Sequence, residues 1–141
     1  MLPGSASVAM VMAGNRSIIY LIDDDDSVRR ALGRVMTHGG LEWEAYDSAE
    51  SFLSGARPGD NGCIVADMTM PGMSGLDLKI LLESSRLHLP LILLTAQDTE
   101  QTRAAARSAG AAAYFRKPVD IQALLDAVQW ALHPSVPPDP A

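Results

Sequence analysis

Short apolar runs recur along the chain, each followed by a stretch with the spacing of a helix. Residues 18–22 form a continuous apolar run that ends in acid, and residues 62–66 and 91–94 form two more. Such runs are typical of strands buried on both faces. Residues 41–46 alternate apolar with acidic side chains, as expected near a sheet edge, and the small residues 111–116 predict a fifth strand.

Helix-like patterns fill the intervals between these runs. A first helix is expected to begin near Ser27 and to end at Gly39 and Gly40, with one apolar face made by Val28, Leu32, Val35 and Met36. Asp47 and Glu50 resemble a capping box for a second helix. The third helix carries Leu76, Ile80 and Leu81, and the fourth spans about residues 99–109. The last helix has apolar residues three and four apart, namely Ile121, Leu124, Leu125, Val128 and Leu132.

Five strand–helix units in this order predict the α/β class, with a five-stranded parallel sheet, helices on both faces and right-handed crossovers. Residues 17–132 are expected to be one domain. Residues 1–16 lack a periodic pattern and are interpreted as a flexible leader. Residues 133–141 contain four prolines, which rule out a continuing helix. We expect no further domain after this tail.

Composition narrows the classes of function. The 141 residues carry a net charge of −6, which argues against a nucleic-acid surface because such a surface needs a basic patch. No apolar run approaches the length of a membrane span, and the first 15 residues have no basic start of a secretion signal. Cys63 is the only cysteine, so no internal disulfide forms. We therefore expect a cytoplasmic protein.

Polar residues stand where the predicted strands end. Asp23 and Asp24 end the first strand, Asp67 the third and Thr95 the fourth, and Lys117 follows the fifth. In open α/β sheets the carboxyl ends of the strands form the site, so these groups are expected to meet. Oxygen ligands without His or Cys favour Mg²⁺ or Mn²⁺. A metal beside a carboxylate, a hydroxyl and a lysine indicates phosphoryl chemistry, with aspartate as nucleophile.

Each piece also has a simpler explanation. Asp25 and Asp26 are expected to cap the following helix, and Asp23 with Asp24 could belong to the same solvated turn. An EF-hand loop does not fit, since Val28 and Arg34 occupy the places of its Gly and Glu. A threonine at a strand end is most often structural, and a lone lysine is usually on the surface. The joint occurrence at separate strand ends favours a site.

Four ordered motifs carry a family resemblance, namely "IDDDDSVR", "VADMTMPGMSG", "LILLTA" and "GAAAYFRKP". Over residues 17–132 the chain resembles the receiver domain of two-component response regulators. The segment "AYDSAESFL" is most similar to the nitrogen-fixation regulators, whose members usually continue into a helix-turn-helix output domain. The resemblance implies a flavodoxin-like sheet with strand order 2-1-3-4-5.

The resemblance also implies roles for single residues. Asp67 matches the aspartate that accepts a phosphoryl group from a histidine of a sensor kinase. The metal ligands would be Asp23, Asp24, Asp67 and the backbone carbonyl of Thr69. Lys117 matches the lysine that pairs with a phosphoryl oxygen, and Pro118 would follow it through a cis bond. The switch residues would be Thr95 and Tyr114, and Thr69 and Gln97 match positions that tune the lifetime of the phosphate.

The expected output face comprises the helix at residues 99–109, the strand at 111–116 and the last helix, with Arg103, Arg107 and Tyr114 on it. It would contact an unknown downstream protein or a dimer mate. The chain would be a switch rather than an enzyme, catalysing only its own phosphotransfer and slow dephosphorylation. No histidine stands at a strand end, which argues against a phosphocarrier role for His38, His88 or His133. Val119 departs from the family, which usually has Phe there.

Two other functions compete with the switch. A phosphatase of the haloacid-dehalogenase type would use Asp67 as nucleophile but needs a second Asp two residues later, where Thr69 stands. A flavin-binding electron carrier would need a Ser/Thr/Gly-rich phosphate loop after the first strand. The aspartates at that place would instead repel the flavin phosphate.

Overall fold

A computed structural model of the chain describes residues 17–56, 61–70, 72–84 and 89–133. The predicted leader, most of the predicted tail and His88 lie outside these ranges. Strands and helices alternate through the described part in the order β1 (Ile18–Ile22), α2 (Asp26–His38), β2 (Glu42–Tyr46), α3 (Ala49–Gly55), β3 (Gly62–Asp67), α4 (Gly75–Ser84), β4 (Leu91–Thr95), α5 (Glu100–Ser108), β5 (Ala113–Arg116) and α6 (Ile121–Leu132).

The five strands form one parallel sheet in the order β2-β1-β3-β4-β5. This confirms the predicted fold class and strand order. Ile22 lies opposite Ala66, and Asp67 lies opposite Leu94 in the register of the central strands. The ends of β1, β3 and β4 therefore meet at one edge of the sheet, as the sequence predicted.

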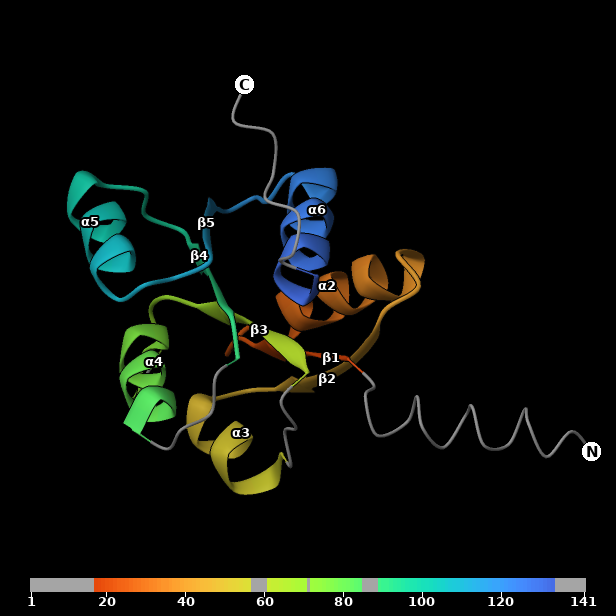
Figure 1. The fold of residues 1–141 in the computed structure, drawn as a ribbon, viewed down its shortest axis with the longest axis horizontal. Helices are drawn as coiled ribbons and strands as arrows, with labels where there is room; N and C mark the ends of the chain where they lie inside the picture. The colour runs from red at the N-terminus through yellow and green to blue at the C-terminus, as the bar shows by residue number, and fades with distance from the viewer. Residues whose placement is uncertain (1–16, 57–60, 71, 85–88, 134–141) are drawn as a thin grey trace, which may run out of the picture.

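Helices cover both faces of the sheet (Figure 1): α2 and α6 lie on one side, and α3, α4 and α5 on the other. Successive side chains of β1 point to opposite faces of the sheet and so belong to the two apolar layers in turn. Ile19 and Leu21 pack with α2 and α6, whereas Tyr20 and Ile22 pack with the other three helices. The rings of Tyr20 and Phe52 meet edge to face at 5.2 Å. The rigid centre of the sheet thus anchors the strand ends that carry the polar residues.

The edge strand β2 is largely exposed. Its Trp43 lies across Gly33 of α2, where a Cβ atom would stand 2.6 Å from the indole ring. The indole Nε1 donates to Thr37 Oγ1 at 2.9 Å. A side chain at position 33 would therefore have to displace the indole ring, and glycine avoids this in a helix interior where it otherwise costs stability.

The start of α2 follows the prediction. Asp25 is the N-cap, and its carboxylate accepts hydrogen bonds from the backbone N–H groups of Ser27 and Val28. The Ser27 hydroxyl also donates to it at 2.7 Å. These hydrogen bonds, that of the Ser27 side chain first, lower the pKa of Asp25. Asp26 lies in the first turn of the helix.

The predicted capping box of α3 is wrong. Ser48 is the N-cap, because its hydroxyl accepts from the Ser51 N–H at 3.0 Å. Asp47 instead accepts from the Ser51 hydroxyl at 2.9 Å. Glu50 points to the loop after β3, where it accepts from the Met73 N–H at 3.3 Å. Ser48, next to Asp47, is also a favourable N-cap residue, but the spacing of Asp47 and Glu50 led to the wrong choice.

The sequence also misjudged α4. Its buried apolar side chains are those of Leu78 and Leu82, whereas Ile80 is 65% exposed and Leu81 37% exposed. Apolar residues lie all around this helix, so their spacing did not reveal which side faces the core. None of the helices in the described ranges has the length and apolar character that a membrane crossing requires.

Candidate functional site

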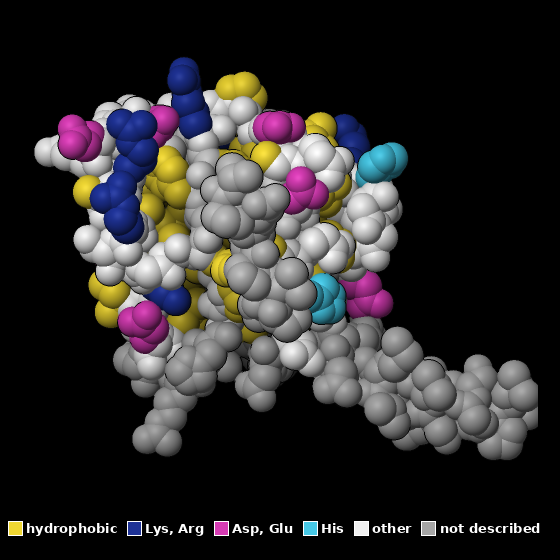
Figure 2. All heavy atoms as spheres, turned by 45° about the horizontal axis from the view of Figure 1, so that its top comes forward, with side chains coloured by type: hydrophobic (Ala, Val, Ile, Leu, Met, Phe, Trp, Pro, Cys, Tyr) yellow, Lys and Arg dark blue, Asp and Glu magenta, His cyan; other side chains and the backbone are white. Residues whose placement is uncertain are grey.

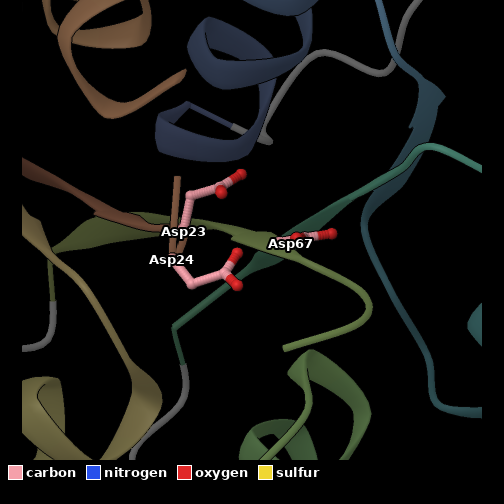
Figure 3. A group of neighbouring side chains, drawn as sticks. All are labelled: Asp23, Asp24 and Asp67. Atoms are coloured by element: carbon pink, nitrogen blue, oxygen red, sulfur yellow. The ribbon is translucent and has the colours of Figure 1, made fainter. Parts of the chain in front are cut away.

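Three carboxylates converge at the edge where β1 and β3 end (Figure 3). Asp23 and Asp24 follow β1, and Asp67 is the last residue of β3. One carboxylate oxygen of each lies within 4.8 Å of the others. Asp23 is 1% exposed and Asp67 8%, while Asp24 faces solvent. The parallel register brings together side chains that are more than 40 residues apart.

Lys117 supplies the cation of this cluster. Its Nζ donates to Asp23 Oδ2 at 2.8 Å and lies 3.5 Å from Asp67 Oδ2. Its backbone N–H donates to the Thr95 carbonyl at 2.7 Å, which ties the segment after β5 to the end of β4. Burial alone would lower the pKa of Lys117, but the hydrogen bonds and charges of Asp23 and Asp67 together outweigh burial, so the pKa is raised.

Asp67 has a raised pKa because burial disfavours its charged form. The Thr69 N–H, which donates to Asp67 Oδ1 at 3.3 Å, opposes this shift, as does the charge of Lys117. The negative charge of Asp23 adds to it. The site therefore holds more negative charge than Lys117 compensates.

The backbone at Asp23 is fixed by contacts that the sequence did not reveal. Asp23 Oδ1 accepts from the Asp25 N–H at 2.9 Å. Arg29 reaches back from α2, where Nη1 donates to the Asp23 carbonyl at 2.6 Å and Nη2 to Asp26 at 2.7 Å. The spacing of Asp26 and Arg29 signals a helical ion pair, but no pattern indicates the contact of Arg29 with the turn. Arg29 thus orients the acidic turn from outside the cluster.

Thr95 is 2% exposed at the end of β4. Its hydroxyl donates to the Gln97 carbonyl and accepts from the Gln97 N–H, both at 3.0 Å. Tyr114 on β5 is half-buried, and its hydroxyl lies 2.7 Å from Thr102 Oγ1 and donates to Asp98 at 3.1 Å. The structure thus links the two predicted switch residues through the loop before α5, and Thr102 is the member that sequence reasoning missed.

Pro118 follows Lys117 through a cis peptide bond, as the resemblance implied. Beside them lies a cavity of about 500 Å³ between α2 and α6, whose lining includes Val28, Leu32, Lys117, Val119 and Leu124. Val119 is part of the apolar layer under α6. The cavity occupies the neighbourhood in which the family usually has the larger Phe.

A second, smaller hollow of about 270 Å³ lies on α5 and β5, lined by Arg103, Ala106, Arg107, Ala111, Ala113 and Tyr114. Figure 2 shows Lys and Arg side chains beside exposed hydrophobic ones on this part of the molecule. The hollow on the predicted output face is therefore lined by basic and apolar side chains, on a chain whose net charge is −6.

The donor set of the cluster fits a hard divalent cation. Mg²⁺ binds oxygen at about 2 Å, so ligands on one ion lie within about 4 Å of each other. The three carboxylate oxygens lie within 4.8 Å of one another, so a small movement of the side chains would bring them to this separation. Among the described residues no His or Cys joins the group, and soft-ligand metals are therefore disfavoured.

Fold and site together define a single α/β domain with an acidic site at the carboxyl edge of its sheet, and comparison with known proteins gives its family. Residues 19–129 match the response regulator receiver domain. The chain belongs to this family.

Curated relatives agree with this assignment. The transcriptional regulatory protein FixJ of Azorhizobium caulinodans is 38% identical over 114 residues, which are 81% of this chain and 54% of FixJ. Nodulation protein W of Bradyrhizobium diazoefficiens is 35% identical over 116 residues, 82% of this chain and 51% of that protein. The chain spans about half the length of these relatives. The predicted similarity to the nitrogen-fixation regulators is confirmed.

Solved structures give the same result. The response regulator StyR superposes with a TM-score of 0.76 at 38% identity, covering 83% of this chain and 59% of that one. The structure of FixJ-N has a TM-score of 0.77 at 30% identity and covers 85% of this chain and 96% of its own. Both support the receiver fold.

Proposed function

We propose that this chain is a phosphorylation-dependent signalling switch in which Asp67 accepts a phosphoryl group from a phosphohistidine of a sensor kinase. One observation carries the assignment: Asp67 lies at the end of the central strand β3, close to both an acidic pair and the Lys117 ammonium. Family membership supports the switch itself and its place in two-component signalling.

The chain's own groups account for the transfer. A carboxylate oxygen of Asp67 forms the new bond to phosphorus while the bond from phosphorus to the kinase histidine breaks. The electron pair of that bond returns to the imidazole. Lys117 neutralises charge on the phosphoryl oxygens, since its ammonium is already 3.5 Å from Asp67 Oδ2. The Thr69 N–H orients the other carboxylate oxygen.

A divalent cation would be held by Asp23, Asp24, Asp67 and the backbone carbonyl of Thr69. Mg²⁺ is the proposed ion, and Mn²⁺ meets the same requirements. When bound, the ion supplies further neutralisation of the phosphoryl oxygens. Asp24 is best placed to remain a ligand, because Asp23 already accepts from Lys117 and from the Asp25 N–H.

The proposed response begins at Thr95. A phosphoryl group on Asp67 offers new acceptor oxygens, and the Thr95 hydroxyl leaves Gln97 to donate to one of them. Tyr114 then moves inward, and the face formed by α5, β5 and α6 changes its shape. Such local changes bias a two-state surface. Thr69 and Gln97, two exposed residues beside the site, would set how quickly water removes the phosphate.

The proposed partners are a sensor histidine kinase, which supplies the phosphoryl group, and a downstream protein that reads the face of α5, β5 and α6. A second copy of the chain is the alternative reader of that face. The hollow with Arg103 and Arg107 favours an acidic contact. We propose no direct contact with nucleic acid or membrane, and a location in the cytoplasm.

The proposed chemistry is a single cycle, unlike that of an enzyme acting on separate substrates. A phosphatase would need a general acid beside Asp67 to turn over. The residue two positions after Asp67 is Thr69, which offers no such acid. Many turnovers on a general phosphate ester would contradict the switch.

Phosphorylation by acetyl phosphate with Mg²⁺ tests the assignment. Mass spectrometry of the intact protein should show one added acid-labile phosphate. Asp67→Asn should abolish it, while Asp126→Asn on the exposed side of α6 should leave it unchanged. Labelling that persists in Asp67→Asn would overturn the assignment of the phosphoacceptor.

A further inference from the structure

A chain of hydroxyl contacts runs from the site to the surface of α5. Thr95 Oγ1 donates to the Gln97 carbonyl at 3.0 Å, and Thr102 Oγ1 lies 3.1 Å from the same oxygen. Thr102 Oγ1 is also 2.7 Å from the hydroxyl of Tyr114, which donates to Asp98 at 3.1 Å. Thr102 is thus the junction between the loop that holds Thr95 and the side chain of Tyr114.

We propose that Thr102 is a positioning residue whose hydroxyl couples the side chain of Tyr114 to that of Thr95. The inference rests on the proposed function, because it concerns how phosphorylation at Asp67 reaches the output face. It adds a residue that lies outside the four motifs on which the family resemblance rests.

Counting hydrogens shows how the coupling works. Thr102 has one hydroxyl hydrogen, and Tyr114 has one. Asp98 only accepts when ionised, so when Tyr114 donates to Asp98 the short contact between the two hydroxyls needs Thr102 as its donor. In this arrangement the Gln97 carbonyl accepts its hydrogen bond from the Thr95 hydroxyl.

The second arrangement follows when Thr95 turns to the phosphoryl group. The Gln97 carbonyl loses that donor, and the Thr102 hydrogen, already 3.1 Å away, takes its place. Thr102 then has no hydrogen for Tyr114, and Tyr114 keeps the short contact only by donating to Thr102. It thereby gives up Asp98, which retains the guanidinium of Arg103 at 3.7 Å. Tyr114 no longer donates to Asp98, and the rearrangement of hydrogen bonds that Thr95 began has thus reached the surface of α5 and β5.

Thr102 also has a structural role, which the experiment must separate. As the third residue of α5 it forms a capping box with Thr99: the Thr99 N–H donates to Thr102 Oγ1 at 2.9 Å, and the Thr102 N–H donates to Thr99 Oγ1 at 3.1 Å. The Thr99 carbonyl, 2.9 Å away, is a further acceptor for the Thr102 hydroxyl. Thr99→Ala weakens the same cap but leaves the hydroxyl of Thr102, so it is the matched control.

The test uses tyrosine-ring NMR with beryllofluoride and Mg²⁺ as a mimic of the acyl phosphate. The chain has three tyrosines, and Tyr114→Phe assigns the signal of Tyr114. In the wild type, beryllofluoride should shift that signal and leave Tyr20 and Tyr46 nearly unmoved. In Thr102→Val the shift should fall below half of the wild-type value, whereas Thr102→Ser and Thr99→Ala should keep it.

Bound beryllofluoride is measured separately by fluorine NMR. Wild-type protein that binds none would overturn the phosphoacceptor assignment and the coupling with it. Bound beryllofluoride with a full Tyr114 shift in Thr102→Val would overturn the role of Thr102 alone, as would an equal loss in Thr99→Ala. Should Thr102→Val fail to fold, Thr102→Ala replaces it, with the same expected loss and the same contradicting result.

Discussion

Lys117 lies nearer to Asp23 than to Asp67. Its Nζ is 2.8 Å from Asp23 Oδ2 and 3.5 Å from Asp67 Oδ2. The resemblance assigned this lysine to a phosphoryl oxygen, yet in this structure it first neutralises the more deeply buried carboxylate. One ammonium thus lies beside two buried acids, and the stability of the strand ends is expected to depend on it.

Lys117→Met is therefore expected to lower the free energy of unfolding by about 3 kcal/mol, because it leaves buried carboxylates without their cation. Urea unfolding at pH 7 without Mg²⁺ measures this loss. Lys79→Met is the matched control, since Lys79 pairs with the exposed Glu83 at 3.6 Å, and its expected cost is below about 1 kcal/mol. Equal losses in the two variants would contradict the role of Lys117.

Mg²⁺ should stabilise the folded protein, because it binds carboxylates that only the fold brings together. At ten times its dissociation constant the gain is about 1.4 kcal/mol, measured by thermal unfolding against NaCl of equal ionic strength. Asp24→Asn should remove most of the gain, and Asp26→Asn, outside the cluster, should preserve it. An equal gain from NaCl would show screening of charge instead of a site.

Val119→Phe is expected to raise the free energy of unfolding by about 1 kcal/mol, because the larger ring buries more apolar area in the cavity between α2 and α6. Val119→Ala should lower it by a similar amount. Urea unfolding at pH 7 checks both variants. A loss of stability in Val119→Phe would mean that the cavity does not accept the ring.

Cys63 should make stability fall at alkaline pH. Burial raises the pKa of its thiol from 9.0 to about 12. Between these values the unfolded chain releases the thiol proton and the folded chain keeps it, so stability is lost as the pH rises above about 9. Wild type should lose about 1.4 kcal/mol more than Cys63→Ala between pH 8 and pH 10. Rapid alkylation of the native thiol at pH 8 would contradict the burial on which this rests.

The sequence predicted which residues meet at the edge of the sheet, because strand ends leave a clear signal. Apolar runs that stop at Asp23, Asp67 and Thr95 locate both the strands and their tips. Parallel pairing then brings these residues to one edge, whatever lies between them in the chain. The strand order itself came from the family resemblance, because apolar pattern alone does not rank neighbouring strands.

Contacts made by helices and loops were less visible. Glu50 carried the spacing of a cap but bonds the Met73 N–H instead, while Ser48 caps α3. Arg29 and Thr102 act on groups several residues away through side chains whose direction depends on the completed fold. In α4 the helix's own apolar residues lie on all of its sides, so periodicity did not identify Leu78 and Leu82 as the buried pair.

The small ring that Thr95 closes with Gln97 has a consequence for the proposed switch at rest. The hydroxyl both gives and receives a hydrogen bond there, and leaving this ring costs about 1 kcal/mol for each bond. Without a phosphoryl group to accept a hydrogen bond from Thr95, the rotamer in which its hydroxyl has left Gln97 is populated to about a few per cent. Signalling by the unphosphorylated protein would therefore stay low. Its level would be set by the strength of the two hydrogen bonds between Thr95 and Gln97.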